Sequence, residues 1–350
     1  MSICVFACAK NEELYISEWI YYHLKLGFDK IIIYDTSEDY SLEKTNFNFN
    51  DKIEIHHKPN KGKPFKHELK IDEWIENEKI IDRFKYIAVI DIDEFIVLKQ
   101  HNNIKDFLKF INLKNGCLGI NWRLFGSNNH NEYTSSLVLN RFTKCSKTLN
   151  NHVKCISILQ DIERHDCCPH HPVLINGTQI NEKGKELYKI QNETFKHPID
   201  GNTSCFQMYP TSEYIQINHY SIKSMEEFNK RFINHHTRSD TKLFLDEHNK
   251  NEIEDKTALN FLLKNVEFKN FDYHFYILYY QDLLINGIIN EETALNHFNN
   301  KGKKEKRISN INYDYDLWKK NNNNNNNKNL MNEEIWNIVK IELLKQIYNN

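Results

Sequence analysis

A short apolar run followed by two closely spaced aspartates is the feature that most limits what this chain can fold into. Residues 86–90 read Tyr-Ile-Ala-Val-Ile, which is typical of a buried strand, and Asp91 and Asp93 come directly after them. Because side chains alternate faces along an extended chain, we expect the two carboxylates to point the same way. Two anions this close repel each other unless a hard cation lies between them, and Mg²⁺ or Mn²⁺ bridged to a substrate diphosphate is the usual occupant. The pattern therefore predicts a metal-diphosphate site, with an acidic loop after a core strand as the simpler alternative.

The composition is that of a folded protein. Of the 350 residues, 40% are hydrophobic, and they include 18 Tyr and 21 Phe, which is enough for one large domain with an appendage or for two medium domains. The formal net charge of -2 provides no basic field, so we expect no nucleic-acid partner. The eight cysteines show no repeated CxxC spacing, and we expect them to be reduced thiols.

The first apolar stretch is short. It covers residues 3–9 and is followed by the polar Lys10 and Asn11, so it is too short for a signal peptide or a membrane span. We therefore expect a soluble, cytoplasmic protein with no membrane span.

Strand-like and helix-like patterns alternate through the first half of the chain, as they do in a parallel α/β sheet. The predicted strands are residues 3–9, 30–34, 53–56, 86–90, 118–122, 137–141 and 154–159. The predicted helices are residues 11–26, 65–81 and 104–110. Asn11 is expected to cap the first helix, and Gly27 is expected to end it in the left-handed conformation. Asp35 begins a polar turn at the carboxyl end of the second strand, where open α/β sheets bind their ligands.

The pattern divides the chain into three parts. Residues 1–265 form the predicted α/β domain, within which residues 228–263 look mainly helical. Residues 266–310 have their own spacing of aromatic and aliphatic positions and are predicted to form a small helical module. Residues 311–350 contain a run of seven asparagines, which predicts a disordered linker before a last amphipathic helix.

Several motifs along the chain carry a resemblance to a known family. They lie at residues 8–12, 18–23, 26–30, 33–35, 91–95, 122–127, 141–142, 152–154, 217–220, 223–224, 227–228 and 231. In this order they resemble glycosyltransferase family 92 and its family 2-like relatives, over residues 3–231. The resemblance implies an α/β protein of the GT-A fold, a Rossmann-like mixed sheet flanked by helices. It also implies transfer of a sugar from a nucleotide sugar, with a UDP-sugar favoured, to a glycan, glycoprotein or other hydroxyl acceptor, with inversion.

The resemblance also implies metal ligands. Asp93 would bind the metal directly, while Asp91 would bind the metal, ribose or a metal-bound water. His219 is the candidate for the remaining protein ligand, with a structural histidine bonded to backbone as the open alternative. The expected cofactor is Mn²⁺ (or Mg²⁺), because a divalent ion neutralises the departing diphosphate without needing a proton.

The nucleotide would lie against the first strand and the turn after it. Ala9 and Asn11 belong to this segment, and Glu12 or Asp35 would accept hydrogen bonds from the base or ribose. The chain has neither GxGxxG nor GxxxxGK[ST], which argues against dinucleotide dehydrogenases and P-loop NTPases.

Three further residues are candidates for contacts to the donor. Lys154 is a possible diphosphate partner, with an exposed lysine as the alternative. Trp122 could stack on a sugar ring or end a core strand. His170 could face the donor or acceptor, or be an ordinary loop histidine.

The residue that deprotonates the acceptor is open. The candidates in the second half of the domain are Glu132, Asp161, Glu163, His165 and Asp166. Of these we take Asp166 as the catalytic candidate, and Glu94 as either a second possible base or, preferably, a residue that orients the site. The surrounding histidines and cysteines at residues 165–171 are too crowded along the chain to favour a tetrahedral zinc site.

Two other classes of protein compete with this interpretation. A haloacid dehalogenase-type phosphatase also carries Asp-x-Asp after a strand. However, its motif has Thr or Val where this chain has Phe95, and the motif normally lies on the first strand. A catalytically inactive carbohydrate or nucleotide-sugar binding protein with the same fold remains compatible with the sequence, since an intact motif does not prove turnover.

Overall fold

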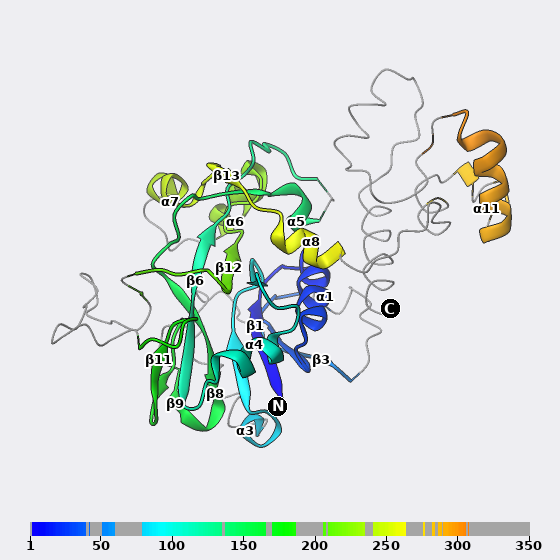
Figure 1. The fold of residues 1–350 in the computed structure, drawn as a ribbon. Helices are drawn as coiled ribbons and strands as arrows, with labels where there is room; N and C mark the ends of the chain where they lie inside the picture. Colours follow the sequence, from blue (N-terminus) through cyan, green and yellow to red (C-terminus); the bar gives the residue numbers. More distant parts are fainter. Residues whose placement is uncertain are drawn as a thin grey trace.

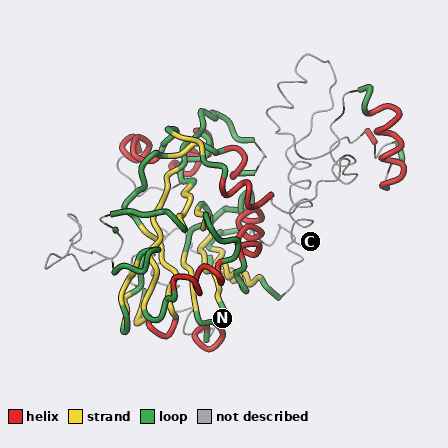
Figure 2. The backbone as a smooth tube through the Cα atoms, viewed as in Figure 1, coloured by secondary structure: helices red, strands yellow, loops and turns green. Residues whose placement is uncertain are grey.

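The structure is a computed structural model that describes residues 2–39, 42, 51–59, 79–134, 137–165, 170–186, 206–207, 209–234, 241–263, 276, 282–283, 286–288, 290–305 and 307. Its centre is a large curled sheet with helices packed around it (Figures 1 and 2). The strands of this sheet are β1 (Ile3–Ala9), β2 (Lys30–Asp35), β3 (Ile53–His57), β4 (Tyr86–Val89), β5 (Glu94–Leu98), β6 (Gly116–Leu124), β8 (Val153–Ile158), β11 (Thr178–Ile180) and β12 (Ile215–His219).

The remaining described elements are short strands and helices. Two small sheets pair β7 (Lys144–Cys145) with β13 (Ile253–Glu254) and β9 (Ile162–Arg164) with β10 (Val173–Leu174). The α-helices are α1 (Ile16–Leu26), α3 (Ile80–Arg83), α4 (Ile104–Ile111), α5 (Val138–Arg141), α6 (Met225–Asn234), α7 (Thr241–His248), α8 (Thr257–Leu263) and α11 (Glu291–His297). A 3₁₀ turn, η2 (Leu159–Asp161), and a π-helical turn, η3 (Phe298–Gly302), complete the set.

The sheet is mixed, which confirms the predicted fold class. Its strand order is β3-β2-β1-β4-β8-β6-β12-β5, with β11 paired to β6. The strands β3, β2, β1 and β4 are parallel, whereas β8 runs antiparallel to both of its neighbours and β5 runs antiparallel to β12. From β1 the chain adds β2 and β3 on one side and then returns to place β4 on the other side. This reversal between β1 and β4 is a topological switch point, where open α/β sheets bind ligands.

Strand β1 is buried on both faces. All seven of its residues are buried, and they belong alternately to two apolar clusters. Val5 and Ala7 pack into the cluster that contains α1, while Phe6 and Cys8 pack into a smaller one with Tyr34. A continuous apolar run is what a parallel strand covered on both sides requires, and it leaves polar groups only after the carboxyl end.

The first helix begins later than predicted. Asn11 does not cap it, because Asn11 has a left-handed backbone with φ of 56° and donates its N–H to Ser37 Oγ at 2.9 Å. A turn over the next residues, in which the Glu12 carbonyl accepts from the N–H groups of Tyr15 and Ile16, leads into α1. The predicted end is confirmed, since Gly27 has φ of 103° after Leu26.

Residues 137–141 were predicted as a strand, and this prediction is wrong, because the segment contains the helix α5. The carboxylate of Glu18, on α1, accepts hydrogen bonds from the N–H groups of Val138 and Leu139 at 2.7 and 3.0 Å. These are N–H groups that a helix start leaves without an internal partner, and an anion there stabilises the helix. A contact with a distant helix thus overrides the local strand pattern.

The other predicted elements agree with the structure within a few residues where they are described. The segments 30–34, 53–56, 86–90, 118–122 and 154–159 correspond to β2, β3, β4, β6 and β8, and 104–110 corresponds to α4. Of the predicted helix 65–81, all but the last three residues lie outside the described residues, and the last two belong to α3. Among the described residues, the buried cysteines that form no disulfide are Cys4, Cys8, Cys117, Cys145 and Cys155.

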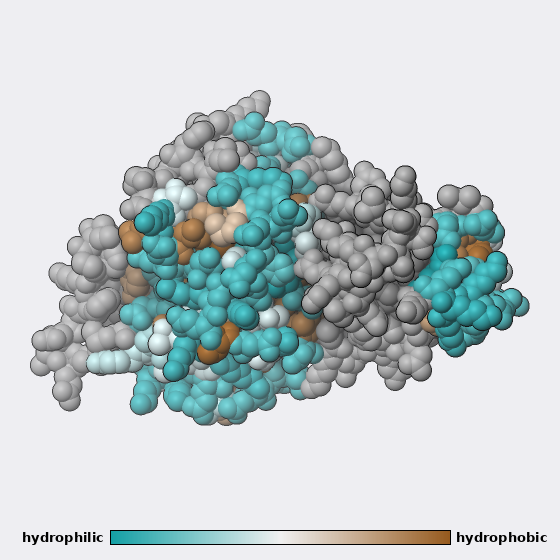
Figure 3. All heavy atoms as spheres, turned by 90° about the horizontal axis from the view of Figure 1, so that it is seen from above, coloured by the Kyte–Doolittle hydropathy of each residue, from teal (hydrophilic) through white to brown (hydrophobic). Residues whose placement is uncertain are grey.

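The surface offers no membrane-crossing helix within the part of the chain that the structure describes. The face seen from above in Figure 3 is mostly hydrophilic, and its hydrophobic residues form small separate groups. Residues 311–350 lie outside the described residues, and so does much of 266–310, apart from α11, η3 and a few neighbours. The division into three parts stays a prediction.

The close approach of Gly116 to Thr178 gives a test of the fold. Gly116 has φ of 78° at the start of β6, and an added Cβ would overlap the Thr178 backbone in the neighbouring β11. We expect Gly116→Ala to lower the free energy of unfolding by about 2–4 kcal/mol, because a left-handed backbone and a steric clash add together. Gly184→Ala is the matched control, since Gly184 has φ of 73° with nothing within 4 Å of the added Cβ. Urea unfolding that gives equal losses for both variants would contradict the β6–β11 packing.

Candidate functional site

The two aspartates lie in the turn that joins β4 to β5. Strand β4 ends at Val89, and the N–H of Glu94 donates to the Asp91 carbonyl at 3.1 Å to close the turn. Strand alternation therefore does not set the directions of Asp91 and Asp93, contrary to the sequence-based expectation. The Asp91 side chain is 31% exposed, whereas that of Asp93 is 3% exposed. Each of them has its own cationic partner.

Lys154 is the partner of Asp91. Its Nζ atom lies 2.8 Å from Asp91 Oδ2 and 3.5 Å from Glu94 Oε2, and its side chain is fully buried. Lys154 reaches the turn from β8, which is the strand next to β4. Burial would lower the pKa of Lys154, but the Asp91 and Glu94 carboxyl groups outweigh it and raise the pKa. The lysine is therefore a fixed internal cation and not an exposed one.

Glu94 braces the turn from inside. Its Oε2 atom accepts a hydrogen bond from the Asp91 N–H at 2.8 Å, while Oε1 is buried with no hydrogen-bond partner among the described residues. Burial, together with the charges of Asp91 and Asp93, raises the pKa of Glu94 well above its ordinary value despite Lys154. A buried carboxyl group in this position is suited to holding the turn in shape.

Asp93 faces Arg231 and His219. The Arg231 Nη1 atom lies 2.6 Å from Asp93 Oδ2, and His219 Nε2 lies 3.6 Å from Asp93 Oδ1. Asp93 Oδ1 is buried and accepts no hydrogen bond from any described residue. Burial alone would raise the pKa of Asp93, but Arg231 and His219 lower it well below its usual range. Asp93 is thus a charged carboxylate with one oxygen available.

His219 is the last residue of β12. Strand pairing sets it opposite Glu94 of β5, which explains how it reaches the acidic turn from far along the sequence. Burial lowers the pKa of His219 to about 4, so its ring is neutral at pH 7. A neutral imidazole is the form that binds metals.

Trp122 lies against a group of imidazole rings. Its ring centroid is 4.3 Å from that of His219, 5.0 Å from His170 and 4.9 Å from His152, on which it stacks. Its buried Nε1–H has no hydrogen-bond partner among the described residues. His170 is held by the Val153 carbonyl, 2.9 Å from its Nδ1, and burial lowers its pKa well below the ordinary value. Trp122 and His170 therefore lie beside the acidic turn.

The candidate nucleotide-binding residues meet at the ends of β1 and β2. The Ala9 carbonyl accepts hydrogen bonds from the Thr36 N–H and hydroxyl, at 2.8 and 3.0 Å. Asp35 is buried, and its two oxygens are already occupied by the Ser37 N–H at 2.9 Å and by His57 Nδ1 at 3.2 Å. Asp35 thus shapes this turn, next to Asn11.

Glu12 interacts electrostatically with the charged residues at the aspartate turn. Its Oε2 atom is buried and has no hydrogen-bond partner among the described residues. Burial raises the pKa of Glu12 to about 7, and Lys223, Arg231 and Asp93 are the next largest influences. Glu12 is therefore a carboxyl group that can be neutral or charged near physiological pH.

Of the candidate bases, Asp166 lies outside the described residues. Asp161 is engaged in structure, because its carboxylate accepts from the Gly116 N–H at 2.7 Å and from the Asn176 amide at 2.9 Å. Glu163 is exposed in β9 and makes an ion pair with Arg164. The contacts of Asp161 and Glu163 are structural and do not point to a role in the reaction.

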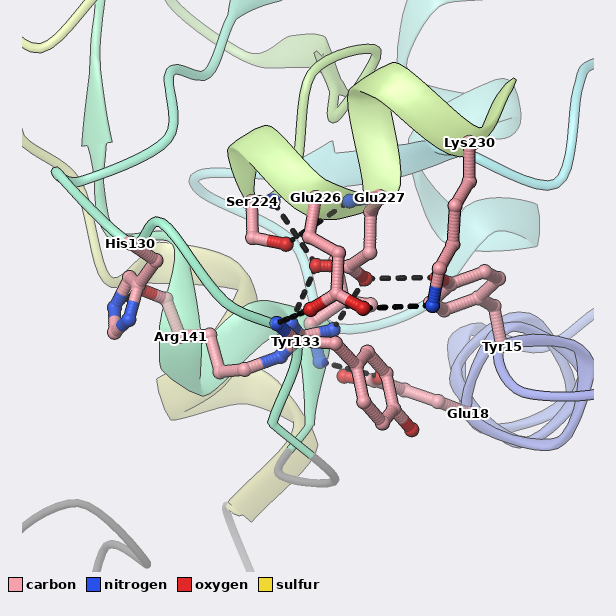
Figure 4. Close-up of polar contacts among 10 residues, drawn as sticks. Tyr15, Glu18, His130, Tyr133, Arg141, Ser224, Glu226, Glu227 and Lys230 are labelled. Carbon is pink, nitrogen blue, oxygen red and sulfur yellow. Dashed lines mark hydrogen bonds and ion pairs between the residues drawn. The ribbon is translucent and has the colours of Figure 1, made fainter. Parts of the chain in front are cut away.

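Sequence reasoning missed a buried ion pair that anchors α6 (Figure 4). The Nη1 and Nη2 atoms of Arg141 both donate to Glu227, at 2.8 and 3.0 Å, and the two side chains are 2% and 6% exposed. Glu227 also accepts from the Tyr15 hydroxyl at 2.7 Å and from the Ser224 N–H at 3.0 Å. Arg231 follows Glu227 by one helical turn, so the pair holds in place the helix that carries Arg231. The four-residue spacing of Glu227 and Arg231 was the signal in the sequence that these two residues share one face of a helix.

The Arg141–Glu227 pair gives a stability test. We expect Glu227→Gln to lower the free energy of unfolding by about 2–3 kcal/mol, because it leaves the buried guanidinium of Arg141 facing a neutral amide. Glu226→Gln on the same helix is the control, since Glu226 is 39% exposed in its pair with Lys230 and should change stability by less than about 1 kcal/mol. Denaturant unfolding that ranks the two variants in the opposite order would contradict the buried pair.

The same pair predicts a pH dependence. Burial would raise the pKa of Glu227, but the charge of Arg141 and the hydrogen bonds from Arg141 and Ser224 lower it to about 2. An unfolded glutamate has a pKa of about 4.3, so the stabilisation is complete above about pH 5 and is lost as the pH falls towards 2. We expect the unfolding free energy to fall less steeply in this window for Glu227→Gln than for the wild type. Equal slopes in urea titrations at several pH values would show that Glu227 is not the group concerned.

Comparisons with known proteins place the chain in a family. The model of glycosyltransferase family 92 matches residues 1–198, which is more than half of the 350 residues, although His219 and Arg231 lie beyond the match. No curated protein matches the sequence.

Solved structures resemble the chain only remotely. S. aureus TarS 1-349 in complex with UDP-GlcNAc is 16% identical over 38% of this chain and 37% of that one, with a TM-score of 0.26. HddC from Yersinia pseudotuberculosis is 14% identical over 66% of this chain and 97% of its own, with a TM-score of 0.30. The alignment thus spans just over a third of that TarS chain, and these scores carry no argument about function. On the family match, the chain belongs to glycosyltransferase family 92.

Proposed function

We propose that the chain transfers a sugar from a UDP-sugar to a hydroxyl group of a glycan or glycoprotein, with inversion and with the help of Mn²⁺ or Mg²⁺. The observation that carries the proposal is the placement of Asp93 and His219. Asp93 lies in the acidic turn that follows β4, His219 ends β12, and their Oδ1 and Nε2 atoms lie 3.6 Å apart. The turn lies at the carboxyl end of β4, beside β1, where the strand order reverses.

The residues at this place fit a divalent ion. Asp93 Oδ1 is a buried charged oxygen that accepts no hydrogen bond from the described part of the chain, and His219 presents a neutral imidazole to it. No group of three or more metal-binding side chains occurs within the described ranges. Such a group is not required, because Mg²⁺ is usually held by one or two carboxylates, water and substrate phosphates. When bound, the ion would offset the charge that develops on the leaving diphosphate.

The neighbouring residues would order the donor. Asp91 is fixed by Lys154 and remains partly exposed, so its carboxylate can also accept from a ribose hydroxyl or a metal-bound water. The Nε1–H of Trp122, which has no acceptor among the residues that the structure describes, can donate to a sugar hydroxyl or phosphate oxygen. This role differs from stacking, since His152 already stacks on the ring. The carboxyl ends of β1 and β2, where Ala9, Asn11 and Asp35 lie, would receive the nucleoside.

Release of UDP from UDP-sugars tests the proposal. We expect Mn²⁺-dependent release with the wild type, abolished by EDTA and restored by added Mn²⁺. Asp93→Ala should reduce the rate by about two orders of magnitude or more, because it removes the charged ligand of an ion that supplies several kcal/mol of transition-state stabilisation. Asp106→Asn is the control, since Asp106 is a 66% exposed carboxylate on α4. Unchanged turnover in Asp93→Ala would reject the assignment, and a panel of nucleotide sugars would identify the donor.

A further inference from the structure

Asp93 already has a cation beside it. Arg231 Nη1 lies 2.6 Å from Asp93 Oδ2 and also donates to the Ser221 carbonyl at 3.3 Å. The Arg231 side chain is 42% exposed, while Asp93 is almost completely buried. The ion pair therefore has one enclosed member and one member that reaches solvent.

Two other cations near the turn are enclosed. Lys154 is fully buried between Asp91 and Glu94. Moving its ammonium group away would leave these carboxyl groups without their cation. Lys223 is buried, and its Nζ lies 4.4 Å from the centre of the Tyr15 ring. Of these three cations, Arg231 is the one that can change partners without uncovering a buried ammonium group.

The helix that carries Arg231, α6, is anchored by other residues. The α6 contacts of Glu227 with Arg141, Tyr15 and Ser224 hold the first turn of the helix (Figure 4). Arg231 lies one turn further along and belongs to none of those contacts. A change of its side-chain conformation therefore does not require the helix to move.

The charges at the turn make a change of partner favourable. A divalent ion bound to Asp93 and His219 would compete with the guanidinium for the same carboxylate and repel it. A donor diphosphate brings negative oxygens to the same edge of the sheet, and the planar guanidinium fork matches phosphate oxygens. The two events together would move the preferred partner of Arg231 from Asp93 to the diphosphate.

We propose that Arg231 is a switching counter-ion, which neutralises Asp93 in the empty site and binds the diphosphate of the donor once a divalent ion has taken Asp93. The inference rests on the proposed function. It gives Arg231 a direct contact with substrate and explains why a partly exposed arginine lies beside a buried carboxylate.

Binding measurements in two states test the switch. In titrations with Mn²⁺ alone, we expect Arg231→Gln to bind about two- to fivefold more tightly than the wild type, because the competing partner of Asp93 has been removed. With saturating Mn²⁺ present, we expect the same variant to bind UDP about tenfold or more weakly, because a charged hydrogen bond to phosphate has been lost. Arg231→Lys, which keeps the charge but not the fork, should fall between the two for UDP.

Lys230→Gln is the matched control, because Lys230 is the neighbouring cation on α6 and pairs with Glu226 at the surface. It should change neither Mn²⁺ nor UDP affinity, and thermal unfolding checks that each variant is folded. An Arg231 with a purely structural role would weaken both affinities when removed, and either weaker Mn²⁺ binding or unchanged UDP binding in folded Arg231→Gln overturns the switch alone. A wild type that binds no Mn²⁺ and releases no UDP from any donor overturns the proposed function, and the switch with it.

Discussion

The buried ammonium group of Lys154 is the interaction on which the acidic turn depends. It lies between Asp91 and Glu94 with no exposure to solvent, and it enters from β8, the antiparallel strand inserted beside β4. Burial and the charges of Asp91 and Asp93 raise the pKa of Glu94, and the ammonium group of Lys154 opposes this rise. The order of the strands and the charge state of the turn are therefore one constraint, because moving β8 away from β4 would remove the cation.

Strand pairing also brings together residues that are far apart in the chain. The parallel neighbours β1 and β4 deliver Glu12 and the aspartate turn to the same edge of the sheet. The antiparallel pairing of β12 with β5 then sets His219 opposite Glu94, and the chain after β12 continues into the helix that carries Arg231. The candidate site is thus assembled at one edge by three parts of the sequence, each placed by backbone hydrogen bonds.

Local patterns in the sequence predicted most of the described strands of the sheet, because buried strands need apolar runs whatever surrounds them. They did not predict the directions of Asp91 and Asp93, since a turn replaces the strand after Val89. The segment 137–141 became helical through Glu18, a contact that no local pattern contains. Arg231 was missed as a site residue because a charged residue in a polar helix usually faces solvent, and only the fold shows Asp93 beside it.

Unpaired polar atoms gather at the candidate site. Asp93 Oδ1, Glu94 Oε1, Trp122 Nε1 and His219 Nδ1 are all buried without hydrogen bonds from the described residues. Each such atom costs about 1–3 kcal/mol, so the fold tolerates them only because strands such as β1 are covered by apolar side chains on both faces. A ligand that supplies the missing hydrogen-bond partners removes part of that cost, and it binds the folded chain but not the unfolded one. Ligand binding at the site and stability of the sheet are therefore linked, because the polar atoms that cost stability are the ones that a ligand would contact.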